Sequence, residues 1–134
     1  METRNEQRVG NFKELLVWQK AMALASAVYS LTGRFPSAER FGLVAQMRRA
    51  AVSVPSNIAE GQARNTTGEF VQFISHAEGS LAELETQLRL SLDLNLCGAQ
   101  NAAPLLHMIE EERKMLNALR RSLLARHSSL VTRH

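Results

Sequence analysis

The stretch Gln46–Gly61, QMRRAAVSVPSNIAEG, decides how this chain folds. Its apolar residues recur at the spacing of one helix face, yet Pro55 stands well inside the run. An interior proline removes a backbone donor and clashes with the carbonyl four residues earlier, at a cost of roughly 3 kcal/mol. Short polar side chains at Ser53, Ser56 and Asn57 can bond the carbonyls that a kink frees, and they let another helix approach closely. The stretch therefore predicts a closely packed helix with a kink at Pro55.

Apolar residues at helical spacing predict one helix before this stretch and two after it. Each expected helix has a cap or a stop signal at one of its ends. The expected helices are about 14–32, ending at Gly33; 38–60, capped by Ser37; 67–95, capped by Thr66 or Thr67; and 102–125, capped by Asn101.

One apolar seam on each helix predicts the side chains of the core. In the last helix Glu112 falls where the repeat expects an apolar residue. The predicted seams are Leu15, Trp18, Met22, Ala25 and Tyr29; Leu43, Met47, Ala50, Val54 and Ile58; Phe70, Ile74, Ala77, Leu81, Leu84 and Leu88; and Leu105, Ile109, Leu116, Leu119 and Leu123.

Four helices with short connections predict an all-α fold, an up-down-up-down four-helix bundle with left-handed packing at roughly 20°. We expect the bundle at residues 12–126, between a flexible N-terminal tail at 1–11 and a C-terminal tail at 127–134.

Leucines alternate with polar residues from Leu88 to Leu96, which by period alone is a strand signal. Leucine favours helix, and the preceding repeat runs in without a turn, so we interpret the segment as helix. Leu90 and Leu94 then face away from Leu88. A helix that is apolar on two sides buries more than one bundle core, which predicts a homo-oligomer interface at Leu90 and Leu94. A surplus of core leucine within one chain is the alternative.

Composition limits the class of protein. The 134 residues suit a single domain, and the single Cys97 excludes an internal disulfide and fits a reducing compartment. No apolar run reaches the roughly 18 residues of a membrane span, and the N-terminus is too polar for a signal peptide. We expect a cytoplasmic protein that does not contact membranes.

The net charge of +3 permits contact with nucleic acid without requiring it. No acidic residue follows Glu112, whereas Arg120, Arg121 and Arg126 do follow it. Cations near a helix C-terminus complement the macrodipole, which is one interpretation. A nucleic-acid-binding surface is the other.

Arg48, Arg49 and Arg64 are further candidates for contacts with nucleic acid, because arginine pairs bidentately with phosphate oxygens. The alternative is ion pairing of these arginines with glutamates inside the bundle or between subunits, for which the candidates are Glu60, Glu83 and Glu85.

Three segments stand in an order that is characteristic of one family. They are LLVWQKA at 15–21, RFPSAERFGLVAQMRRAAVSVPSNIAEG at 34–61 and EFVQFISHAEGSLAELETQL at 69–88. Together they resemble the four-helix-bundle family also called 23S rRNA intervening-sequence proteins, over about residues 12–124.

The resemblance implies an up-and-down bundle that assembles into a homopentamer. Some members are encoded within intervening sequences of large-subunit rRNA genes, and a diverged relative, the accessory protein of diversity-generating retroelements, associates with nucleic acid. It implies no catalytic residue. The residues that carry the family signature are Trp18, Pro36, Ser53, Pro55, Ser56, Asn57, Glu60, Gly61, Gly79 and Ser80.

These signature residues have a structural interpretation first. Pro55 is expected to bend its helix, Gly61 to end it, and Gly79 with Ser80 to mark a close helix crossing. A polar ring around a central opening of an oligomer is the alternative.

No constellation of residues indicates catalysis, a cofactor or a small-molecule substrate. Glu69, His76 and Glu83 share a helix face, but di-metal bundles need paired Glu-x-x-His motifs, which this chain lacks, so no metal is expected. Cys97 is interpreted as a packed or idle thiol.

The function expected from the sequence is that of a non-enzymatic homo-oligomeric scaffold, with itself and RNA or DNA as partners. An adaptor that binds another protein and no nucleic acid is the alternative.

Overall fold

The computed structural model describes residues 11–132, and side chains for residues 11–126. This part of the chain contains helices and turns and no strand, so the expected all-α class is confirmed. In chain order the elements are η1 (Phe12–Glu14), α2 (Leu16–Thr32), η2 (Ser37–Glu39), η3 (Arg40–Val44), α3 (Ala45–Gln62), α4 (Thr67–Asp93) and α5 (Ala99–Thr132).

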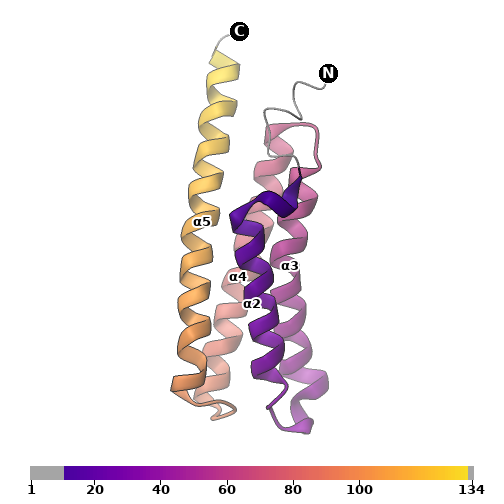
Figure 1. Cartoon of the computed structure of the whole chain (residues 1–134), viewed down its shortest axis with the longest axis vertical. Coiled ribbons are helices and arrows are strands. Elements are labelled where there is room, and N and C mark those ends of the chain that lie inside the picture. The colour runs from indigo at the N-terminus through magenta and orange to yellow at the C-terminus, as the bar shows by residue number, and fades with distance from the viewer. Residues whose placement is uncertain (1–10, 133–134) are drawn as a thin grey trace.

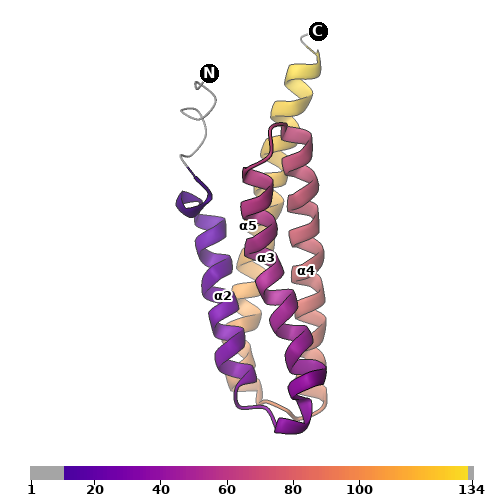
Figure 2. The same ribbon diagram turned by 90° about the vertical axis from the view of Figure 1, so that its right-hand side faces the viewer.

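The four long helices lie side by side along the long axis of the molecule (Figures 1 and 2). The α2–α3 and α4–α5 connections lie at one end, and the α3–α4 connection lies at the other. The main contacts join α2 with α3, α3 with α4, α4 with α5, and α5 with α2. Each long helix therefore packs mainly against two neighbours around a shared core.

Three of the four predicted seams form this core. The α4 seam from Phe70 to Leu88 is buried throughout, and the α3 seam is buried from Met47 to Ile58. In α5 Glu112 is only 1% exposed, so it does occupy the core position that the repeat predicts for it.

The seam predicted for α2 is wrong for most of its residues. Met22 and Tyr29 are exposed, Leu15 and Trp18 are half-buried, and only Ala25 is buried. The core instead receives a second apolar stripe, which places small and medium side chains against α3 and α5. That stripe comprises Val17, Ala21, Leu24, Val28 and Leu31.

The helix caps agree with the prediction at Thr66 and differ from it at Ser37 and Asn101. Thr66 caps α4 as expected, accepting a hydrogen bond from the Glu69 amide at 3.2 Å. Ser37 makes no capping bond, because a turn at η2 and η3 precedes α3. Asn101 is not a cap, since its amide already donates to the Gly98 carbonyl at 3.1 Å.

Asn95 ends α4 with a left-handed backbone (φ 59°). The amides of Asn95 and Leu96 return to the carbonyls of Leu92 and Ser91 at 3.0 and 2.9 Å. This is the hydrogen-bond pattern of a Schellman motif, so α4 stops close to the predicted position.

Helix α5 continues to Thr132, past the expected end of the bundle at 126. The tail expected from 127 is therefore helical in its backbone over 127–132. Leu123 still packs in the core, so the helix needs no new nucleus to extend. The flexible N-terminal tail was expected at 1–11, of which 1–10 lie outside the described residues, as do 133–134.

The regular helix is interrupted before α3 rather than within it. Gly42, inside the π-type turn η3, has φ −103° and ψ −107°, outside helical values. Helix α3 runs through the buried Pro55 to Gln62. The kink at Pro55 stays a prediction.

No described helix is both long enough and apolar enough to cross a membrane.

Candidate functional site

Small polar residues of the family signature join α3 to α4. The hydroxyls of Ser53 and Ser80 lie 2.6 Å apart. The Asn57 amide donates to the Ser53 carbonyl at 2.8 Å and to its hydroxyl at 3.0 Å. These bonds satisfy backbone and side-chain groups beside Pro55, which is the structural interpretation of this segment.

The two signature glycines act differently from what the sequence suggested. Gly61 lies within α3 and has no positive φ, so it does not end the helix. A Cβ there would come within 2.8 Å of the Phe70 ring and of the Phe73 Cβ, so Gly61 is needed for the close approach of α4. A Cβ at Gly79 would meet nothing within 4 Å, so the approach of α3 to α4 does not depend on this glycine, although the neighbouring Ser80 contacts Ser53 of α3.

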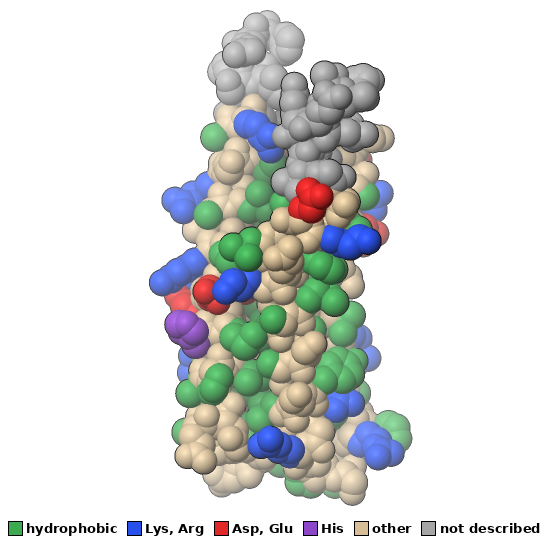
Figure 3. All heavy atoms as spheres, viewed as in Figure 1, with side chains coloured by type: hydrophobic (Ala, Val, Ile, Leu, Met, Phe, Trp, Pro, Cys, Tyr) green, Lys and Arg blue, Asp and Glu red, His purple; other side chains and the backbone are tan. Residues whose placement is uncertain are grey.

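An exposed apolar groove of about 530 Å³ lies between α2 and α3. It is lined by Trp18, Met22, Tyr29 and Val52, with the signature residues Pro55 and Ser56 on its α3 side. Figure 3 shows hydrophobic side chains exposed along the side of α2 that faces α3. We call this surface the α2/α3 groove. The groove contains most of the α2 seam that the sequence assigned to the core, namely Trp18, Met22, Ala25 and Tyr29.

Leu90, near the end of α4, and Leu94, the residue that caps this helix, form a second exposed apolar surface, which we call the α4 leucine patch. They are 44% and 54% exposed, whereas Leu88 is fully buried. The helical interpretation of the alternating leucines is therefore right about their directions. The α4 leucine patch lies on a helix that does not line the α2/α3 groove.

The six arginines proposed for nucleic acid do not form one surface. Arg48 and Arg49 lie near the start of α3, and Arg64 follows the end of that helix. Arg64 pairs with Glu60 at 3.2 Å and covers the Phe73 ring at 4.6 Å. Arg120 is held by Glu78 at 3.1 Å.

Arg121 and Arg126 are exposed on α5, and neither takes part in an ion pair of the described residues. They lie on the half of α5 that leads to its C-terminal end, where α3 also ends (Figure 1). They are therefore far from the start of α3, where Arg48 and Arg49 lie.

Arg48 is fixed in place by α2. Its Nε donates to the Thr32 hydroxyl at 2.9 Å and its Nη2 to the Tyr29 carbonyl at 3.3 Å. The guanidinium lies 4.4 Å from the centre of the Tyr29 ring, a cation–π contact. Thr32 in turn donates to the Val28 carbonyl at 2.7 Å.

A hollow of about 500 Å³ adjoins Arg48, between α2 and the start of α3. Arg40, Phe41 and Arg49 line it together with Arg48 and Tyr29. We call it the arginine hollow. Phe41 is 88% exposed, and sequence reasoning missed both Phe41 and Arg40. The signal available was Phe41 itself, an aromatic residue off the seam and directly before Gly42.

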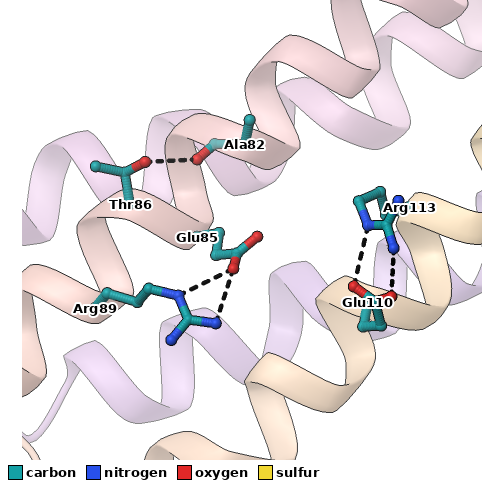
Figure 4. A network of polar contacts seen from close by, with 6 residues as sticks. All are labelled: Ala82, Glu85, Thr86, Arg89, Glu110 and Arg113. Atoms are coloured by element: carbon teal, nitrogen blue, oxygen red, sulfur yellow. Dashed lines mark hydrogen bonds and ion pairs between the residues drawn. The ribbon is translucent and has the colours of Figure 1, made fainter.

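Other exposed arginines are already neutralised within their own helices. Arg89 pairs with Glu85 at 2.9 Å on α4, and Arg113 pairs with Glu110 on α5 (Figure 4). The Arg113 guanidinium lowers the pKa of the Glu110 carboxyl through their hydrogen bonds. Such pairs leave little charge for a ligand.

Pro36, another signature residue, precedes η2 with an extended backbone and is exposed. It lines a smaller hollow of about 260 Å³ beside the arginine hollow, which shares Arg40 and Arg48 with it. This part of the signature therefore lies at the same end of the bundle as Phe41.

Glu112 is the main buried ionisable group. Neither of its carboxylate oxygens has a hydrogen-bond partner. Burial, with a contribution from the neighbouring Glu111, raises the pKa of the Glu112 carboxyl to about 8. Glu111 itself pairs with Lys20 at 3.3 Å, across the contact of α5 with α2.

Among the described residues, no three His, Cys, Asp or Glu side chains are grouped as a metal would require. Glu69, His76 and Glu83 are exposed on α4. Burial raises the pKa of the Cys97 thiol, which disfavours the reactive thiolate.

Comparison with known proteins places this chain in a family. The model of the 23S rRNA-intervening sequence protein family matches residues 13–118, more than half of the 134 residues. No curated protein matches. The matched span contains the α2/α3 groove and the signature contacts of α3 with α4. Fold and family match agree, and the chain belongs to the 23S rRNA-intervening sequence protein family.

Proposed function

We propose that this protein is a non-enzymatic, cytoplasmic scaffold that assembles from identical up-down-up-down, left-handed bundles. The observation that carries this proposal is the α2/α3 groove. The groove exposes Met22, Tyr29 and Val52 together. Single exposed apolar residues are normal on a protein surface, whereas a contiguous apolar patch indicates a binding surface. The alternating ends of the helix connections support the topology.

A second copy of the chain is the occupant that fits the groove. The molecule has a second apolar patch, at Leu90 and Leu94, that the bundle core also leaves uncovered. Apolar contacts of this kind are enriched at the centre of homo-oligomer interfaces. The α2/α3 groove of one copy and the α4 leucine patch of the next offer two surfaces that bury each other.

Contact between two different patches is heterologous. Such contacts close into a ring when the rotation permits. This supports a cyclic assembly, and the resemblance to the family supports five subunits.

Light scattering after size exclusion tests the assembly. Met22→Glu places a charge in the groove and is expected to give a monomer, because burying an unpaired carboxylate opposes association. Ala23→Glu is the matched control, since Ala23 is exposed on the same helix and does not line the groove. We expect this control to assemble like the unmodified protein.

A monomeric unmodified protein would contradict the scaffold and favour the adaptor, in which the groove binds another protein. Assembly that survives Met22→Glu would place the interface elsewhere.

Affinity for RNA or DNA is the second candidate function. The family description names 23S rRNA, and Arg49, Arg121 and Arg126 are exposed without an ion-pair partner among the described residues. Binding of rRNA fragments across a salt series tests it. Affinity that falls steeply with salt is expected, because phosphate contacts release counterions. No binding at low salt would remove this function.

A further inference from the structure

The arginine hollow concentrates positive charge that the bundle does not use. Arg40 and Arg49 are exposed, and neither takes part in an ion pair of the described residues. No acidic residue lines the hollow. In Figure 3 the described Asp and Glu side chains of this face lie at mid-height and above, whereas several Lys or Arg side chains lie below them. The hollow therefore suits an anion.

An aromatic ring stands beside these cations. Phe41 is 88% exposed at the π-type turn, and no ring contact within the described part of the chain occupies it. Burying this ring against another flat ring would remove apolar surface from water. The second aromatic residue of the hollow, Tyr29, already has the Arg48 guanidinium on one face.

From these features we propose that the arginine hollow binds single-stranded nucleic acid, with an unpaired base against Phe41 and the flanking phosphates on Arg40 and Arg49. The volume of about 500 Å³ lies in the range of about 300–1,000 Å³ that small-ligand sites occupy, enough for a base and its sugar. Aromatic rings and arginine planes bind splayed bases, and every base offers a face to stack.

Arg48 gives the hollow a fixed wall. Its guanidinium is held by Thr32 and Tyr29, so the cation is positioned before a ligand arrives. Preorganisation of this kind lowers the entropy lost on binding.

A duplex fits this surface less well. Paired bases are stacked within the helix and cannot reach Phe41. A duplex would also need cations along an extended face, and the remaining candidate arginines lie toward the other end of the bundle (Figure 1). The arginine hollow adjoins the α2/α3 groove, with which it shares Tyr29 and Val52, whereas Arg40, Phe41 and Arg49 do not line that groove.

This inference rests on the nucleic-acid part of the proposed function and names its site. The test is fluorescence anisotropy of a labelled ten-nucleotide single-stranded RNA on the full chain, in about 50 mM salt. A duplex of the same sequence and inorganic phosphate serve as competitors. Phe41→Ala is expected to weaken binding about tenfold to a hundredfold, the range of one lost stacking contact.

The double variant Arg40→Gln/Arg49→Gln is expected to lower the slope of log affinity against log salt by about 1.4, for two phosphate contacts on a single strand. Lys13→Gln/Lys114→Gln is the matched control, with the same loss of charge at exposed residues that do not line the hollow. It is expected to leave the affinity nearly unchanged. Phosphate and duplex are expected to compete weakly.

Each contrary outcome has one meaning. Unchanged binding by Phe41→Ala, or a duplex that binds as tightly as the single strand, overturns the stacking site. A larger loss with Arg121→Gln/Arg126→Gln moves the nucleic-acid surface to α5 and overturns only this inference. No binding of any strand removes the nucleic-acid function as well. A change of mass in light scattering for Phe41→Ala, with RNA affinity intact, makes Phe41 a subunit contact instead.

Discussion

Glu112 shows how one residue sets a condition on the whole core. Its side chain occupies a seam position between apolar neighbours, and it has no hydrogen-bond partner for either oxygen. A buried carboxyl without a partner is tolerated in its protonated form, because desolvation penalises the charge. The raised pKa, about 8 against a usual 4.5, expresses that penalty.

Stability is therefore expected to fall as the pH rises from about 4.5 to 8. In this window the folded state holds a proton on Glu112 that the unfolded state has lost, so raising the pH favours unfolding. The stability that the Glu112 proton contributes is fully present below pH 4.5 and is lost above about pH 8. It amounts to at most roughly 5 kcal/mol of the free energy of unfolding. Urea unfolding at fixed protein concentration, at pH 5 and pH 8, measures it.

Glu112→Leu is the matching variant. It is expected to raise the free energy of unfolding at pH 8 by about 1–4 kcal/mol and to remove most of the pH dependence, because an apolar side chain of similar size needs no proton. An unchanged difference between pH 5 and pH 8 in this variant would assign the dependence to other groups.

For single residues, the sequence showed which positions are unusual more reliably than it showed their roles. Glu112 was recognisable from the break in its repeat. The role of Gly61 was not, because the rings of Phe70 and Phe73 that exclude a Cβ come from the next helix. Phe41 and Arg40 were missed because the π-type turn, which no periodicity announces, determines where they lie.

Among the helices, α2 differs most from its prediction. It has two apolar stripes, and spacing alone cannot tell which one faces the core. The larger side chains, Met22 and Tyr29, look like the core choice, yet the stripe through Ala21 and Val28 is buried. The buried stripe is the one that meets α3 and α5, and the shape of these neighbours is not visible in the sequence of α2 itself.

The contact of α3 with α4 gives a matched pair of glycine substitutions. Gly61→Ala is expected to lower the free energy of unfolding by about 1–3 kcal/mol, because the new methyl group overlaps the two phenylalanines of α4. Gly79→Ala is expected to raise it by about 0.5–1 kcal/mol, because that position is open and alanine is the better helix former. Denaturant midpoints at equal concentration measure both. Equal effects of the two substitutions would contradict the close approach at Gly61.

The boundaries of the elements followed the sequence wherever a local hydrogen bond fixes them. Thr66 begins α4 and Asn95 ends it close to the predicted positions. The ends of α5 were misjudged, since Gly98 rather than Asn101 accepts the first helical bonds and no stop signal precedes Thr132.

For the whole molecule, a contact between two different patches predicts how variants of each patch behave when they are mixed. Met22→Glu leaves the α4 leucine patch intact, and Leu90→Glu leaves the α2/α3 groove intact. Each variant alone is expected to remain monomeric, and an equal mixture is expected to form a dimer, because one good contact can form and neither copy can extend it. Light scattering of the separate and mixed samples measures this. A mixture that stays monomeric would contradict the pairing of these two patches.

The sequence predicted the number of helices and the family, since strong seams and the signature segments determine both. The outward-facing leucines Leu90 and Leu94 were predicted, but the apolar α2/α3 groove was not, because its exposure depends on how α2 is rotated in the bundle.

The order of contacts along the chain bears on how the protein is made. Helices α2, α3 and α4 pack as neighbours in sequence, so their packing can begin while α5 is still being synthesised. Only α5 must reach back to α2, and it brings Glu112 to the core at that moment. Helix α5 thus carries a buried carboxyl that must take up or keep a proton as the helix packs against α2, and closure of the bundle is a protonation-linked step.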